Sequence, residues 1–296
     1  MAIVGRPNAG KSTLLNRLVG EELAVVTDRP QTTRNRILAV KNLEGAQLVL
    51  VDTPGFHRAR SPLNRSMVRT AVRALLDVDV ALVMVELANV PASAQPAPGK
   101  AVEVLLERVR DAKAPAILAL NKVDRVKKPH VLRWIEAMQG MHEWRAIVPI
   151  SALSGDGVAA LQAEIIQALP EGEALYPAEM LTDRAERFFI AELVREQVIL
   201  HSRQEVPYAT AVEVEEFKDL PDKTMVRCVI LVERPTQKGI LVGRAGRTVK
   251  AIGTAARQRM EAFLGRRVDL RLHVRVEARW TRDAAAITRL GYEDEP

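Results

Sequence analysis

Residues 5–12 read Gly5-Arg6-Pro7-Asn8-Ala9-Gly10-Lys11-Ser12. This stretch fits the pattern G-x-x-x-x-G-K-[ST], in which backbone N–H groups and the start of a helix surround phosphate groups. The apolar run at 2–4 predicts a strand before the loop, and residues 11–19 predict a helix after it. A strand, a glycine-rich loop and a helix in this order predict an α/β domain with a phosphate site at the edge of its sheet.

The rest of the first half alternates short apolar runs with helical patterns, which is typical of βαβ units and a mostly parallel sheet with helices on both faces. The residues expected to form strands are 37–40, 47–52, 80–86, 116–121 and 146–150, and those expected to form helices are 63–76, 100–111, 131–138 and 157–169. All the chemical motifs fall just after the ends of these strands. The fold class predicted for residues 1–171 is therefore an α/β P-loop domain.

The second half has a different pattern. A helix over 185–202, strands at 209–216 and 224–233, helices on both sides of 243–246 and a strand from 268 give the order α-β-β-α-α-β. Apolar and polar residues alternate along the last strand, so one of its faces should be buried and the other wet. We expect a linker over 172–180, after Pro170 ends the helical pattern, and a smaller α+β domain over 181–296.

The composition is that of an ordinary globular protein, with 48% hydrophobic and 27% charged residues among 296. The single cysteine, Cys228, excludes a disulfide within the chain and should be buried as a small apolar residue. No apolar segment is long enough to span a bilayer, and no signal-peptide pattern precedes the phosphate loop. We therefore expect a cytoplasmic protein.

The net charge of +6 is unevenly distributed. Residues 223–290 hold three lysines and thirteen arginines against five acidic residues, a local charge of +11 that leaves −5 for the remainder. Two interpretations fit this cluster about equally well: a surface for a polyanion such as nucleic acid, or a solvated basic face.

Two motifs would bind the phosphates and a magnesium ion. Lys11 would neutralise charge on the β- and γ-phosphates, and the Ser12 hydroxyl would bind Mg²⁺. In Asp52-Thr53-Pro54-Gly55, Asp52 would hold the Mg²⁺ shell through water, and the Gly55 N–H would approach the γ-phosphate. The predicted phosphate-binding residues are Gly5, Asn8, Ala9, Gly10, Lys11, Ser12, Thr13, Asp52, Thr53, Pro54 and Gly55.

Two later motifs would select the base. An ionised Asp124, in Asn121-Lys122-Val123-Asp124, can accept from both N1–H and the N2 amino group of guanine, which adenine does not offer. The Lys122 stem can lie along the base, and backbone N–H groups of Ser151-Ala152-Leu153 could reach the guanine O6. Each motif alone is also an ordinary turn, but their order predicts a guanine-nucleotide site for GTP and GDP.

The polar segment Pro30-Gln31-Thr32-Thr33-Arg34 lies between the first two motifs. One threonine could join the Mg²⁺ shell and touch the γ-phosphate, so that the segment orders with GTP and relaxes after hydrolysis. We choose Thr33 over Thr32; the alternative is that both threonines cap local structure. The residues expected to act in catalysis are Lys11, Thr33, Asp52 and Gly55.

With these motifs followed by Gln237-Lys238-Gly239-Ile240-Leu241-Val242-Gly243 and Arg244-Ala245-Gly246, the chain resembles the Era family of bacterial GTPases over essentially its whole length. Matches at 232–239 and 279–283 strengthen the resemblance, because the GTPase motifs alone are shared by many relatives. The resemblance implies a GTPase domain followed by a type II KH domain, which in this family binds the 3′ end of 16S ribosomal RNA during 30S subunit assembly.

The G-x-x-G loop at 243–246 would let an RNA backbone approach closely while a neighbouring groove reads single-stranded bases. The residues expected to contact RNA are Lys238, Gly239, Ile240, Gly243, Arg244, Ala245, Gly246, Arg247 and Lys250. This agrees with the local charge of +11 and favours nucleic acid over a solvated face. We expect a monomer, and leave open a peripheral contact with the inner face of the cell membrane.

The chain departs from the family pattern at two places. Arg244-Ala245 stands where the family usually has Lys-Gly, which adds a Cβ that restricts the approach of RNA; we expect binding to be retained. Only Met1 to Val4 precede the phosphate loop, so either the start of the sequence is shortened or the first strand frays and stability suffers.

The catalytic water is a separate question. In well-known switch GTPases a glutamine follows the glycine of the second motif, and here that position is Phe56, whose ring cannot orient water. We therefore expect slow intrinsic turnover, and Asn8 resembles an asparagine by which some relatives hold K⁺ near the phosphates. The competing interpretations are a kinase, disfavoured because no second substrate pocket is visible, and an RNA-binding module whose guanine-nucleotide site gates binding but turns over negligibly.

Overall fold

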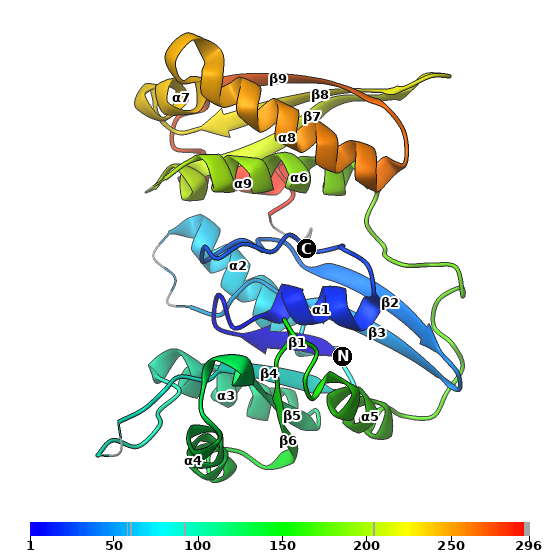
Figure 1. Cartoon of the computed structure of the whole chain (residues 1–296), viewed down its shortest axis with the longest axis vertical. Helices are drawn as coiled ribbons and strands as arrows, with labels where there is room; N and C mark the ends of the chain where they lie inside the picture. The colour runs from blue at the N-terminus through cyan, green and yellow to red at the C-terminus, as the bar shows by residue number, and fades with distance from the viewer. Residues whose placement is uncertain (58, 60, 92, 204, 293–296) are drawn as a thin grey trace. The chain divides into compact units, whose positions relative to one another are not determined.

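The computed structural model describes residues 1–57, 59, 61–91, 93–203 and 205–292 (Figure 1). The chain forms two compact units. The first comprises Met1–Ala24, Thr33–Arg60 and Asn64–Asp183, and the second comprises Val25–Thr32, Ser61–Leu63 and Arg184–Pro296. Among the described residues, no helix combines the length and apolarity needed to cross a membrane.

The first unit is built on a six-stranded sheet with the order β2-β3-β1-β4-β5-β6. The strands are β1 (Ala2–Gly5), β2 (Ile37–Leu43), β3 (Ala46–Asp52), β4 (Ala81–Glu86), β5 (Ala116–Asn121) and β6 (Trp144–Ile150). Only the β2–β3 pair in this order is antiparallel. The parallel strands end at one edge of the sheet, and that edge carries the phosphate loop.

Five helices cover the two faces of this sheet: α1 (Lys11–Val19), α2 (Pro62–Arg73), α3 (Lys100–Ala112), α4 (Lys128–Gln139) and α5 (Val158–Ala168). On one face, Val83, Val85 and Leu118 pack with apolar residues of α2, α3 and α4. The alternate strand residues point to the other face, where the buried residues of α1 and α5 lie. The predicted α/β fold with helices on both faces is confirmed.

The first strand is not frayed. β1 is fully buried and pairs in parallel with β3 on one side and with β4 on the other. The Met1 ammonium group donates to the Val49 carbonyl at 2.8 Å, which continues the pairing to the first residue. Of the two alternatives for the short start, a frayed strand is therefore wrong: a strand in the middle of a sheet is held from both sides.

The segment 172–180, expected to be a linker, lies in the first unit, and the division falls between Asp183 and Arg184. Side chains of the β2–β3 hairpin hold its backbone. Asn42 donates to the Ala178 carbonyl at 2.7 Å and Gln47 to the Tyr176 carbonyl at 2.8 Å. The segment has no helix or strand of its own, yet it follows a defined path along the hairpin.

The second unit has the order α6-β7-β8-α7-α8-β9, the α-β-β-α-α-β succession predicted from the sequence (Figure 1). Its elements are α6 (Glu186–His201), β7 (Thr210–Asp219), β8 (Thr224–Val232), α7 (Pro235–Val242), α8 (Arg247–Leu264), β9 (Val268–Val276) and α9 (Ala284–Arg289). β8 is central, antiparallel to β7 and parallel to β9. One face of the sheet packs on α6, α7 and α8 through a core that includes Val194, Cys228, Leu241 and Ile252.

The other face of this sheet is polar and carries ion pairs. Glutamates of β7 contact arginines of β8 and β9: Glu215 contacts Arg227 of β8 at 3.5 Å, and Glu213 contacts Arg275 of β9 at 3.1 Å. Arg289 of α9 also contacts Glu213, at 3.2 Å. Part of the basic charge counted at 223–290 is therefore neutralised by acidic residues that lie before that window.

Candidate nucleotide and nucleic-acid sites

The loop of residues 5–10 joins β1 to α1 and is shaped for phosphate groups. Gly10 caps α1 with φ 98°, in the left-handed region, and a Cβ there would lie 2.1 Å from Nδ2 of Asn121. Asn8 also has a positive φ, of 63°. The first N–H groups of α1 have no partner within their own helix, so the loop and the helix start together offer donors to an anion.

Lys11 and Asp52 lie buried below this loop. Lys11 Nζ donates to the Arg6 carbonyl at 3.1 Å, which holds the side chain back along the loop. Burial lowers the pKa of the Lys11 ammonium and raises the pKa of the Asp52 carboxyl, and in each case the charge of the other residue opposes the shift. Each charge is costly to bury alone, so an ionic ligand that contacts both is favoured here.

Three side chains that could bind a metal ion through oxygen meet beside the start of α1. The Ser12 hydroxyl donates to Asp52 Oδ2 at 2.6 Å and lies 2.8 Å from the Thr33 hydroxyl. Asp52 Oδ1 is buried and has no hydrogen-bond partner among the described residues. Mg²⁺ prefers oxygen ligands and keeps several of its own waters. Two hydroxyls and a carboxylate with one buried oxygen that has no hydrogen-bond partner therefore suit this ion. Ser12, Thr33 and Asp52 therefore fit the metal predicted from the sequence.

The two threonines of the polar segment have different surroundings. The Thr32 hydroxyl donates to the Arg29 carbonyl at 2.7 Å and lies 2.6 Å from the Thr27 hydroxyl, so it caps local structure. Thr33 instead reaches Ser12. The arrangement supports the choice of Thr33 and, for Thr32, the alternative of a local cap.

The segment after Asp52 lies against the phosphate loop. The Thr53 hydroxyl donates to the Ile3 carbonyl at 2.8 Å, and the Phe56 N–H donates to the Gly5 carbonyl at 2.9 Å. The Phe56 ring is buried in the apolar core of the sheet. Gly55 and Pro54 are therefore fixed beside the loop, while position 56 offers no polar atom to a catalytic water.

Asn121 links the phosphate loop to the loop after β6. Its Nδ2 donates to the Ala9 carbonyl at 2.7 Å, and its Oδ1 accepts from the Ala152 N–H at 2.9 Å. The side chain is buried, so it acts as a tether between two loops that would contact opposite ends of a nucleotide. The spacing of the motif predicted a base contact for Asn121 but not this tether.

The other residues expected to contact the base lie around a part of the first unit that is exposed to solvent. Lys122 has φ 73° and contacts Glu86 at 2.7 Å, while Asp124 is exposed. Ser151 is buried, its Oγ accepts from the Ser154 N–H at 3.1 Å, and Leu153 is exposed. The carboxylate of Asp124 is therefore accessible to the edge of a base.

Arg17 was not predicted as part of the site. Its Nε donates to the Ala152 carbonyl at 2.7 Å, and its guanidinium also reaches the Leu153 carbonyl. It lies on α1, the helix that begins at the phosphate loop. A lone arginine six residues after Lys11 gives no signal in the sequence, because its partners are backbone atoms 135 positions away.

In the second unit, the loop of residues 243–246 joins α7 to α8. Gly243 has φ 71° and ψ 174°, and a Cβ there would lie 2.2 Å from the Thr248 hydroxyl. Ala245 has φ 52° and ψ 33°, a left-handed conformation that is strained for alanine. Around this loop, Lys238, Gly239, Ile240, Arg244, Arg247 and Lys250 are exposed, and Gly246 is half-buried. The residues expected to contact RNA thus lie on α7, on the loop that follows it and on the first turn of α8.

Comparison with known proteins identifies the family in which this nucleotide site and this basic loop occur together. The chain is 46% identical to GTPase Era of Geobacter metallireducens, over 99% of this chain and 96% of that protein. The chain belongs to the Era family. Era of Syntrophus aciditrophicus is 42% identical over 99% of this chain and 94% of its own length. The family described as 50S ribosome-binding GTPase matches residues 1–122, and the KH domain family matches residues 205–281.

Two solved Era structures have the same fold. A variant of Aquifex aeolicus Era bound to GDP·AlF4⁻ has a TM-score of 0.92, and an Era complex with MgGDPNP and nucleotides 1506–1542 of 16S ribosomal RNA has a TM-score of 0.93. Both are 38% identical to this chain and cover 99% of it and 98% of the solved chain. As a member of the Era family, this chain is a GTPase whose α/β domain precedes a KH domain, as the sequence predicted.

Proposed function

We propose that this chain is a GTP-hydrolysing switch whose KH domain binds the 3′ end of 16S ribosomal RNA, and that it acts in assembly of the 30S subunit. The convergence of Ser12, Thr33 and Asp52 next to the phosphate loop carries the nucleotide part of the proposal. The exposed basic loop at 243–246, together with the Era complex that contains 16S ribosomal RNA, supports the RNA part.

In this proposal, Lys11 and the loop amides bind the phosphates of GTP, and Ser12, Thr33 and Asp52 hold Mg²⁺. The metal ion neutralises the charge that develops on the transferred phosphoryl group. Thr33 contributes to switching because its hydroxyl lies 2.8 Å from that of Ser12, within the same proposed Mg²⁺ site. When the γ-phosphate is lost, the contacts that would order the residues around Thr33 are therefore lost with it.

Turnover is expected to be slow because Phe56 is buried and apolar, and Asn8 is proposed to hold K⁺ near the phosphates. The prediction is a GTPase rate that is higher in K⁺ than in Na⁺ at equal ionic strength, and an Asn8→Ala variant that loses most of this difference. Steady-state phosphate release in the two salts measures it. Equal rates in K⁺ and Na⁺ would show that K⁺ takes no part in the mechanism.

The base assignment is tested with Asp124→Asn. The carboxylate of Asp124 accepts from N1–H and the N2 amino group of guanine, and an amide would instead offer a donor to the C2 oxygen of xanthine. Affinity for GDP should fall by about tenfold or more, because a charge-assisted hydrogen bond contributes about 1.5–3 kcal/mol. Titration with GDP and XDP measures both affinities, and Asp156→Asn, on the neighbouring loop, is a control with the same loss of charge. Unchanged GDP affinity contradicts the assignment.

The link between the two domains is tested by measuring affinity for a short single-stranded RNA with GTP analogue, with GDP and without nucleotide. A switch requires different affinities in at least two of these states. Equal affinities in all three, with measurable GTP hydrolysis, would leave a GTPase and an RNA-binding domain that do not communicate. This experiment also separates the switch from an RNA-binding module with negligible turnover.

A further inference from the structure

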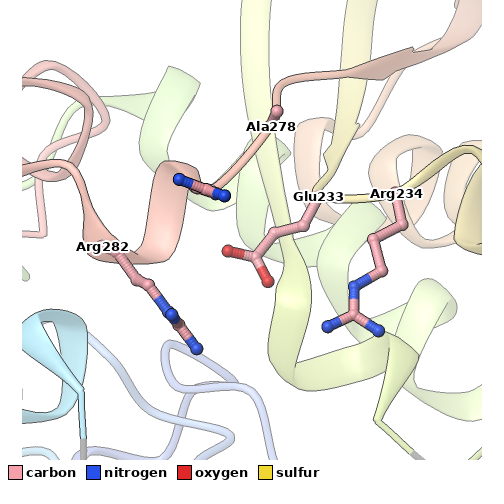
Figure 2. Close-up of a pocket in the computed structure, with 5 residues that line it drawn as sticks. Glu233, Arg234, Ala278 and Arg282 are labelled. Carbon is pink, nitrogen blue, oxygen red and sulfur yellow. The ribbon is translucent and has the colours of Figure 1, made fainter.

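A cavity of about 370 Å³ lies in the second unit, at the carboxyl ends of the parallel neighbours β8 and β9. Glu233 and Arg234 line it from the segment after β8, and Ala278, Arg279 and Arg282 line it from the segment after β9. Figure 2 shows Arg234 and Arg282 on either side of the Glu233 carboxylate. Three guanidinium groups and one carboxylate make the lining strongly basic.

The arginines of the cavity differ from those on the polar face of the sheet. Arg227, Arg275 and Arg289 form ion pairs with glutamates. In the part of the chain that the structure describes, no salt bridge involves Arg234, Arg279 or Arg282. Three guanidinium groups share this lining with the single carboxylate of Glu233, so the cavity keeps an excess of positive charge that an anion would offset.

The walls of the cavity are fixed by contacts beneath them. Glu233 Oε1 accepts from the Thr281 hydroxyl at 2.6 Å, which ties the segment after β8 to the segment after β9. Trp280 is fully buried, donates from Nε1 to the Ala209 carbonyl at 3.0 Å and stacks on Tyr292. The cavity is therefore formed before any ligand arrives, which lowers the entropic cost of binding.

Helix α7 connects this cavity to the loop at 243–246. Arg234 precedes the first residue of α7 and Gly243 follows its last residue. Eight helical residues span about 12 Å, a distance that a short single strand of RNA can bridge. Arg234 and Lys238, four residues apart, lie on one side of the helix, and Lys238 is exposed. Basic side chains thus continue from the cavity toward the loop.

We propose that the cavity lined by Arg234, Arg279 and Arg282 is a second RNA-contact site, which holds a phosphodiester of the same single strand that the 243–246 loop binds. The inference rests on the proposed RNA function of the KH domain and extends its footprint to the other end of α7. The guanidinium groups bind the phosphate and offer flat faces to a base, while Glu233 accepts from a base amino group.

The chemistry of the lining favours RNA over a free anion. A bare phosphate ion offers no amino donor to the Glu233 carboxylate, whereas cytosine, adenine and guanine each carry an amino group from which it can accept. The cavity volume of about 370 Å³ is in the range of small-molecule sites and exceeds what a phosphate group alone would fill. A nucleotide unit supplies both the anion and the amino donor.

The test uses the full chain and two single-stranded RNAs from the proposed target sequence. The shorter has about four nucleotides, the length that a G-x-x-G loop clamps, and the longer has about three times as many. In the double variant Arg279→Gln/Arg282→Gln, affinity for the longer RNA should fall about tenfold. The slope of log K against log salt should weaken by roughly 0.7–1.4, because up to two phosphate contacts are lost. Affinity for the shorter RNA should not change.

The matched control is Arg267→Gln/Arg271→Gln. It removes the same charge from the other end of β9, where Arg267 directly precedes the strand, Arg271 lies in its first half, and both are exposed. A third variant, Arg244→Gln/Lys250→Gln, should weaken binding of both RNAs. Equal midpoints of urea unfolding for the three variants would show that each keeps the fold.

The outcomes separate the two proposals. If the cavity variant binds the longer RNA as the wild type does, or loses no more than the control, while the loop variant loses affinity, the cavity is not an RNA site but the RNA function stands. If the wild-type chain binds neither RNA, both proposals fail. If inorganic phosphate binds the wild type, is lost in the cavity variant and RNA affinity is unchanged, the occupant is a free oxyanion and the RNA assignment is overturned.

Discussion

Asn121 lies between two loops that would contact different parts of a nucleotide, and it is only 2% exposed. In Asn121→Ala, the Ala9 carbonyl and the Ala152 N–H lose their partner in a buried site. Because an unsatisfied buried group costs about 1–3 kcal/mol, we expect unfolding free energy to fall by at least that amount and GDP affinity to fall with it. Urea unfolding and nucleotide titration measure the two effects.

Asn89→Ala is the control for this experiment, since Asn89 is exposed and its hydrogen bond to the Arg125 carbonyl is long, at 3.4 Å. A loss of stability in Asn121→Ala no larger than in Asn89→Ala would show that the tether is not important for stability.

Cys228 provides a second test at this scale. Burial in the core of the second unit, with a smaller contribution from Glu215, raises the pKa of the Cys228 thiol to about 12. The thiolate is the reactive form, so iodoacetamide at pH 8 should label the native chain far more slowly than the chain in denaturant. Mass spectrometry after timed quenching gives the two rates. Labelling of the native chain at the denatured rate would place Cys228 at the surface.

The backbone conformation of the loop between α7 and α8 leads to a prediction about the stability of the second unit. Ala245 is held at φ 52° and ψ 33°, which costs an L-residue with a Cβ roughly 1–2 kcal/mol relative to an unstrained conformation. Ala245→Gly should therefore stabilise the second unit, offset in part by the greater freedom of glycine in the unfolded chain. Thermal unfolding measures the change.

Gly243→Ala should have the opposite effect, because its Cβ would clash with Thr248. At Gly246, with φ 75° but no atom within 4 Å of an added Cβ, alanine should cost only about 1 kcal/mol. A destabilised Ala245→Gly, or equal losses in the two glycine variants, would contradict the loop geometry.

Most helices and strands could be predicted from the sequence, because their patterns are formed by residues close together in the chain. The helix at 11–19 follows a glycine-rich loop and has the predicted bounds, and the last strand, which alternates apolar and polar residues, begins at the predicted residue 268. The side chains that join loops could not be predicted. Arg17 and Asn121 bond to backbone atoms far away in the chain, and such bonds leave no periodic pattern.

Charge is a property of the whole molecule, and the structure changes its interpretation. The acidic residues of β7 lie outside the basic window 223–290 but pair with its arginines across the sheet. In the described part of the chain, basic residues without a salt bridge lie on α7 and its loop and in the segment after β9, but also around the start of β9, where Arg267 and Arg271 are exposed. The glutamates therefore weaken the attraction for RNA on the polar face of this sheet.

Glu213→Gln/Glu215→Gln tests this effect. The variant removes both carboxylate partners of Arg275, while Arg227 keeps Glu216 and Arg289 keeps Glu277. We therefore expect higher affinity for RNA of unrelated sequence at low salt, and little difference at high salt. Stability should change by less than about 1 kcal/mol per pair, because the pairs are exposed. Fluorescence anisotropy with labelled RNA measures the affinity. The control is Glu171→Gln/Glu173→Gln, two exposed residues of the first unit, and an equal gain in that variant would make the effect one of net charge alone.

Helix α1 begins at Lys11 in the phosphate loop, and its Arg17 holds the loop of Ala152 and Leu153. Six residues of helix separate these contacts by about 9 Å along a stiff axis. A displacement of the phosphate loop is therefore carried by the helix to the loop that faces the base. We expect the residence time of the guanine ring to depend on how many phosphates the nucleotide carries, even though no residue of the chain need contact both ends of the nucleotide.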